Sequence, residues 1–90
     1  MEPVSDAAEP ARSPLRAVVE VVVRALVDRP DEVRVTESQR RGMTMLELST
    51  APGDMGKIIG RQGRTVSALR TLVSVTAEKH GLRAQLDLRD

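Results

Sequence analysis

Two glycines stand close to several basic side chains in the middle of this chain. Gly60 and Gly63 enclose Arg61 and Gln62, and a helical pattern begins at Arg64. Glycine can take a positive φ and lets another backbone approach closely, because it has no Cβ. The first amides of a helix have no partner within the helix, and together with the helix dipole they attract an anion such as a phosphate. The types and spacing of these residues therefore predict a turn that binds phosphate.

The residues on both sides of the turn extend it to a longer motif. The run Ile58-Ile59-Gly60-Arg61-Gln62-Gly63-Arg64-Thr65-Val66 has an aliphatic pair, then Gly-x-x-Gly, then an aliphatic residue three positions later. This order resembles the signature of the KH domain, whose loop holds the backbone of about four single-stranded nucleotides. The resemblance implies that single-stranded RNA contacts the following residues: Lys57, Ile58, Ile59, Gly60, Arg61, Gln62, Gly63, Arg64 and Val66.

The polar residues of this set are expected to hold the RNA backbone. Arg61, Gln62 and Arg64 bind phosphates together with the loop amides, and the two glycines permit the close approach that this requires. Lys57, which stands just before the motif, steers the RNA toward the loop.

The aliphatic residues of the set are expected to form the floor of a groove for the bases. They are Ile58, Ile59 and Val66, and we expect Ile59 to lie in an aliphatic core. KH domains place bases on aliphatic side chains, so a chain without Phe, Trp or Tyr is compatible with this resemblance. The same absence excludes RNA-recognition motifs and cold-shock domains, which stack bases on aromatic rings.

Other kinds of site find little support in the sequence. A P-loop needs Ser or Thr after Gly-Lys, but Ile58 follows Gly56-Lys57, and a dinucleotide fingerprint needs two glycines two positions apart, which do not occur. No nucleophile with a base and no paired carboxylates can be assembled, so we do not expect an enzyme. With no cysteine and with His80 as the only histidine, we expect neither a metal site nor a cofactor.

The length and composition fit a small domain that acts by local charge. The chain has 90 residues and a net charge of +1, so binding to nucleic acid must depend on where the basic residues lie. No apolar run is long enough for a membrane span or a signal sequence, which favours the cytoplasm and no membrane partner. Residues 1–13, with prolines, acids and little large apolar content, are expected to form a disordered tail before the domain at 14–90.

The first helix is expected from Leu15 to Asp28, with Ser13 as its N-cap and Pro14 in its first turn. Charged residues recur every four positions along one face, and the apolar arc opposite them covers about 200°. An arc of this width is broader than packing on one side requires. Two explanations remain open: a second buried contact, such as one with another chain, or a helix sunk deeply into its own core.

Three strands are expected from the alternation of apolar and polar residues. They cover Glu32–Glu37, Met43–Thr50 and Leu82–Arg89. The polar segment 38–42 is expected to form a hairpin loop of about five residues between the first two strands. In the second strand, Met43 and Met45 fall on the face that is expected to be exposed.

Two helices are expected to hold the Gly-x-x-Gly turn between them. The first is short, is capped by Asp54 and ends at Ile59. The second runs from Arg64 to His80, with Gly81 as its C-cap. Its apolar face has residues three and four positions apart: Val66, Leu69, Val73 and Ala77.

The resulting order, α-β-β-α-α-β, predicts an α+β fold with a three-stranded mixed sheet and helices packed on one face. It is the order of the type II KH fold. A domain of this length with Asp54-Met55-Gly56-Lys57 before the motif resembles the small bacterial single-KH proteins of the KhpA family.

This family resemblance implies a homodimer, a second KH-containing partner of the KhpB type, and a role as RNA chaperone or post-transcriptional regulator. In some bacteria such proteins affect cell length and envelope growth. The alternative is a protein–protein scaffold on the same fold that does not bind RNA directly.

Overall fold

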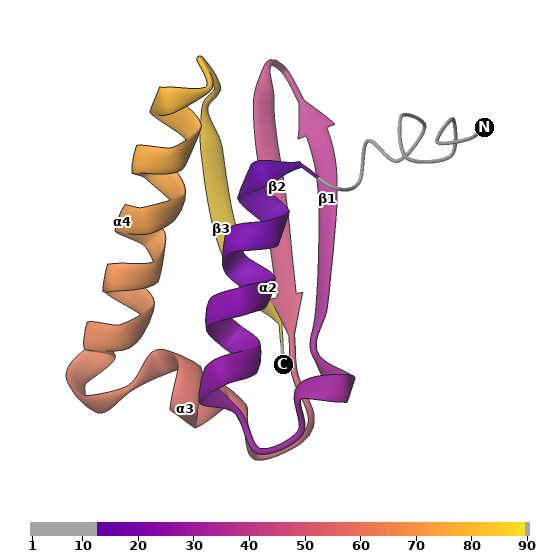
Figure 1. Cartoon of the computed structure of the whole chain (residues 1–90), viewed down its shortest axis with the longest axis vertical. Helices are drawn as coiled ribbons and strands as arrows, with labels where there is room; N and C mark the ends of the chain where they lie inside the picture. Colours follow the sequence, from indigo (N-terminus) through magenta and orange to yellow (C-terminus); the bar gives the residue numbers. More distant parts are fainter. Residues whose placement is uncertain (1–12, 90) are drawn as a thin grey trace.

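A computed structural model describes residues 13–89 of the chain (Figure 1). The expected disordered tail lies outside the described residues, except for Ser13. The elements are, in order, α2 (Pro14–Leu26), the 3-10 turn η1 (Pro30–Glu32), β1 (Arg34–Arg40), β2 (Met43–Ser49), α3 (Met55–Ile59), the 3-10 turn η2 (Arg61–Gly63), α4 (Arg64–Lys79) and β3 (Ala84–Arg89).

The three strands form one mixed sheet in the order β1-β2-β3. β1 and β2 pair as an antiparallel hairpin, and β3 returns through the helices to lie parallel to β2. α2 and α4 lie side by side over one face of this sheet (Figure 1). The expected α+β order of the type II KH fold, with its mixed sheet and helices on one face, is therefore confirmed.

One core lies between the helices and the sheet. All four apolar residues expected on one face of α4 are buried. Three of them, Leu69, Val73 and Ala77, share one core cluster with Leu15, Val19 and Val23 of α2 and with inward side chains of the strands. Because residues three or four apart share a face of a helix, the sequence spacing predicted these contacts correctly.

The apolar arc of α2 extends beyond this core. Val21 is 70% exposed. Ala17, Val18, Val21 and Val22 line a shallow hollow on the surface of α2. Deep burial of α2 in its own core is thus wrong as an explanation of the wide arc.

The start of α2 is fixed by Ser13, as expected. Its hydroxyl accepts a hydrogen bond from the Arg16 amide at 3.2 Å and donates one to the Glu37 carboxylate of β1 at 2.6 Å. The helix ends at Leu26, two residues earlier than expected, because Val27 takes an extended conformation that turns the chain toward β1.

The β1–β2 connection is shorter than expected. β1 continues to Arg40, which pairs with Met43, so the turn contains only Arg41 and Gly42, both with positive φ. The expected loop of about five residues is wrong, because polar residues also occur on an exposed edge strand. In the hairpin, the side-chain amide of Gln39 donates a hydrogen bond from Nε2 to the Thr44 hydroxyl at 2.9 Å.

Three smaller expectations also need correction. Asp54 does not cap α3, because its own backbone is helical; instead its buried carboxylate accepts a hydrogen bond from the Arg29 amide at 3.1 Å. Met43 and Met45 are half-buried rather than exposed on the open face of the sheet. Leu82 precedes β3 and is 42% exposed, since the chain is still turning after α4.

Candidate nucleic-acid interface

The Gly-x-x-Gly loop joins the end of α3 to the start of α4. Gly60 has a φ of 73°, and a Cβ added to it would lie 2.7 Å from the Thr65 Cβ. A real Cβ does not come so close, so only glycine fits between the loop and the first turn of α4. Gly63 meets no such neighbour, but its φ of 72° also favours glycine.

Gln62 has a left-handed backbone as well, with φ 57° and ψ 25°. For a residue other than glycine this conformation costs about 1–2 kcal/mol. The loop keeps this unfavourable conformation, and the side chains of Arg61 and Gln62 are exposed. Such strain in a loop that presents polar side chains is typical of a binding site.

The start of α4 remains open to an anion. Its N-cap is Gly63, which has no side chain to bond the first amides, and its first turn contains no acidic residue. The Arg64 amide bonds to the Arg61 carbonyl, so the uncapped amides are those of Thr65 and Val66. Backbone donors at a helix start attract negative charge.

The basic residues predicted to surround this helix start differ in whether they form an ion pair. Arg61 and Arg64 are exposed, and neither forms an ion pair within the described residues. Lys57 is paired with Asp28 of the α2–η1 connection at 3.4 Å. The two arginines are therefore available for phosphates, whereas Lys57 would first have to leave a weak exposed partner.

The aliphatic residues do not form one continuous floor. Ile58 has no exposed surface and belongs to the core, whereas Ile59 is 41% exposed and Val66 8%. The expectation that Ile59 lies in the core is wrong: successive residues of a helix point about 100° apart, and here Ile58 takes the inward direction. Ile59 and the edge of Val66 are the aliphatic surface that remains beside the loop.

Arg70 was not among the predicted site residues. Its Nε donates a hydrogen bond to the Leu86 carbonyl at 3.2 Å, which links α4 to β3. β3 is an edge strand, and this carbonyl points away from β2. The sequence showed a basic residue at this position, but only the packing of α4 shows that it faces β3.

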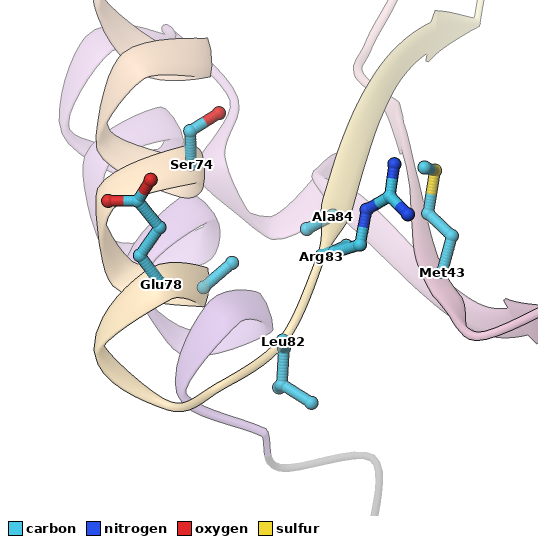
Figure 2. A pocket seen from close by; sticks show the side chains of 7 residues that line it. Met43, Ser74, Glu78, Leu82, Arg83 and Ala84 are labelled. Carbon is cyan, nitrogen blue, oxygen red and sulfur yellow. The ribbon is translucent and has the colours of Figure 1, made fainter.

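A hollow of about 250 Å³ lies farther along α4, at the start of β3 (Figure 2). We call it the α4–β3 hollow. It is lined by Met43, Ser74, Ala77, Glu78, Leu82, Arg83 and Ala84. Ser74 and Glu78 come from α4, and Arg83 comes from the chain just before β3 (Figure 2).

Residues 13–89 offer neither a metal site nor a membrane-spanning helix. No group of three His, Asp or Glu side chains there could hold a metal ion. Nor does this part of the chain have a helix with the length and apolar character that a membrane crossing requires.

Comparison with known proteins agrees with this geometry. The sequence model of the family described as KhpA/KhpB, KH domain, matches residues 16–88. The RNA-binding protein KhpA of Halalkalibacterium halodurans is 47% identical over 76 residues, which are 84% of this chain and all of that protein. The KhpA protein of Treponema pallidum is 45% identical over 73 residues, or 81% of this chain and 91% of the relative.

A third relative, the RNA-binding protein KhpA of Chlamydia pneumoniae, is 44% identical over 69 residues, which cover 77% of this chain and 88% of that protein. The matched region spans the fold from the first turn of α2 to the end of β3. The motif, the fold and these matches lead to one conclusion: the chain belongs to the KhpA/KhpB family of KH domains.

Proposed function

We propose that this protein binds single-stranded RNA and holds its phosphates with the Gly-x-x-Gly loop. The observation that carries the proposal is the pair of exposed arginines, Arg61 and Arg64, beside the uncapped start of α4. Phosphate contacts position a nucleic acid, and arginine forms strong paired hydrogen bonds with phosphate oxygens. The relatives named RNA-binding proteins support the same role.

The surface beside the loop favours single-stranded RNA over a duplex. Ile59 is the exposed aliphatic side chain there, and an unpaired base can lie on it. In a duplex the face of each base is covered by the neighbouring base pairs, so it cannot lie on the Ile59 side chain. Single-stranded RNA should therefore bind more tightly than a duplex of the same sequence.

Binding should be weak and sensitive to salt. Two to four phosphate contacts on a single strand predict a log–log slope of affinity against salt of roughly −1.5 to −3. Fluorescence anisotropy with a labelled single strand and the matching duplex, repeated at several salt concentrations, measures both properties. An affinity that does not change with salt contradicts the phosphate contacts, and equal affinity for the duplex contradicts binding of unpaired bases.

We further propose that the protein forms a homodimer through the apolar hollow on α2. This surface contains only alanine and valine side chains, and Val21 is largely exposed. A two-fold axis brings the same patch of both copies together, so an apolar patch on an otherwise polar helix face suits self-association. A second KH protein of the KhpB type would be an additional partner.

The dimer predicts a doubled mass in light scattering at micromolar concentration, and Val21→Asp should make the protein monomeric. The matched control is Val75→Asp, which places the same charge on the exposed valine of α4 and should leave the dimer intact. If the wild-type protein is a monomer at high concentration, this role of α2 is wrong.

The cellular role that we propose is that of a cytoplasmic RNA chaperone or post-transcriptional regulator rather than an enzyme. The features that support it are those of a binding surface: exposed cations, a strained loop and an aliphatic contact. A scaffold that binds only protein remains the second candidate, favoured by the exposed apolar hollow on α2. RNA titration distinguishes the two.

A further inference from the structure

A second group of basic side chains lies at the opposite end of α4 from the Gly-x-x-Gly loop. Arg40 pairs with Met43 across the β1–β2 hairpin. On the other side of β2, the Thr44 amide donates a hydrogen bond to the Arg83 carbonyl at 2.8 Å. Arg40, Arg41 and Arg83 are thus neighbours at one end of the sheet; we call them the hairpin-end cluster.

No ion pair neutralises the hairpin-end cluster within residues 13–89. All three arginines are exposed. The nearby acid Glu37 lies on the opposite face of β1 from Arg40, and its carboxylate accepts a hydrogen bond from the Ser13 hydroxyl. Glu78 lines the α4–β3 hollow, but it is not paired with Arg83. The cluster therefore presents net positive charge to solvent.

Arg41 occupies a position where arginine is unfavourable. It is the first residue of a two-residue hairpin turn and has a φ of 54°. Turns of this kind strongly prefer Asn, Asp or Gly, which adopt a positive φ with little strain. Among the described residues, Arg41 and Gln62 are the two non-glycine residues with positive φ, and they stand at opposite ends of α4. Strain that is retained in a residue with a strong phosphate-binding group indicates a function for that group.

The α4–β3 hollow lies at the hairpin end of α4, next to Arg83. α4 begins at the Gly-x-x-Gly loop and ends beside the start of β3, where Arg83 and Met43 both line the hollow (Figure 2). With 16 residues, α4 is about 24 Å long. At about 3.4 Å for each stacked nucleotide, this length corresponds to about seven nucleotides, more than the four that a KH loop holds.

We propose that the hairpin-end cluster is a second phosphate-binding site, so that one RNA strand is held at both ends of α4. The proposal rests on the proposed RNA binding at the loop and extends its footprint. The loop binds the first nucleotides, a base or sugar lies in the α4–β3 hollow, and Arg41 and Arg83 hold phosphates beyond it. The hollow suits a base rather than a phosphate, because the Glu78 carboxylate accepts hydrogen bonds from amino groups and repels anions.

The test compares a short and a long RNA. The variant Arg41→Asn with Arg83→Gln removes two charges, and asparagine suits the turn, so the fold should remain at least as stable. The probes are oligocytidylates of about four and about twelve nucleotides, whose bases carry an amino group from which Glu78 can accept a hydrogen bond, bound to the full chain and followed by chemical shifts and anisotropy. We expect about tenfold weaker binding of the long RNA, less than a twofold change for the short one, and a salt slope for the long RNA that is smaller by about 1.4.

The matched control is Arg24→Gln with Arg34→Gln, which removes the same charge from α2 and from the far end of β1, away from the hollow. It should change neither affinity more than twofold. Unchanged binding of the long RNA by the hairpin-end variant overturns the second site, and so does equal weakening of both RNAs. If substitutions in the Gly-x-x-Gly loop leave the affinity for the short RNA unchanged while the affinity for the long RNA still depends on Arg41 and Arg83, the loop proposal fails and the second site stands. A wild-type protein that binds neither RNA overturns both proposals.

Discussion

Replacing Ile58 with aspartate will unfold the domain, whereas the same change at Ile59 will leave it folded. Ile58 has no exposed surface, while 41% of Ile59 is exposed. Removing a buried aliphatic side chain costs about 2–5 kcal/mol, and burying an unpaired carboxylate in its place costs more. A small domain within a chain of 90 residues lies at the lower end of a stability range of about 5–15 kcal/mol, so it cannot tolerate Ile58→Asp.

Thermal melts followed by circular dichroism measure this difference. Ile59→Asp should melt cooperatively within a few degrees of the wild type but bind RNA more weakly, since the charge lies beside the loop. Ile58→Val keeps an apolar side chain and should cost only about 0.5–1.5 kcal/mol, which makes it the control for the position. A wild-type melting curve for Ile58→Asp would contradict the burial of Ile58.

The different positions of these two isoleucines show what the sequence could not predict. In α4 the apolar residues repeat over about three turns, so the buried face was predictable from spacing alone. α3 has only five residues, which is too short for a periodic pattern to identify which isoleucine points inward. The packing of α3 against the core decides this, and that packing depends on elements far away in the sequence.

Contacts between distant residues explain the other differences. Asp54 stands where a helix cap is expected, but its partner is the amide of Arg29, 25 residues earlier. Nothing local in the sequence indicates this pairing. The hairpin was mispredicted because serine, glutamine and arginine are common both in loops and on exposed edge strands. The turn at Gly60 and Gly63 was predictable, since their spacing indicated a tight loop and glycine adopts the positive φ that both residues have without strain.

Replacing Arg61 and Gln62 together by aspartate should abolish RNA binding without unfolding the protein. Both side chains are exposed, and Gly60 and Gly63 keep the shape of the loop. Aspartate also adopts the left-handed backbone of Gln62 more readily than most residues, so the change in stability should stay within about 1 kcal/mol.

Binding should suffer far more than stability. One arginine is lost, and two carboxylates take its place in front of the uncapped amides of α4, where a phosphate would lie. The carboxylates repel the RNA backbone and can themselves bond to the Thr65 and Val66 amides. Loss of a charged contact together with like-charge repulsion predicts at least a hundredfold weaker binding, or about 3 kcal/mol.

The control must lower the net charge equally at another place. Arg34→Glu with Arg24→Gln does so on β1 and α2, and it should bind RNA within about twofold of the wild type if the effect is local rather than a consequence of overall charge. Gel shifts and melts on the same samples separate binding from folding. If the loop variant melts like the wild type and binds RNA with the same affinity, the Gly-x-x-Gly segment is only a turn between two helices, and the proposed function is wrong.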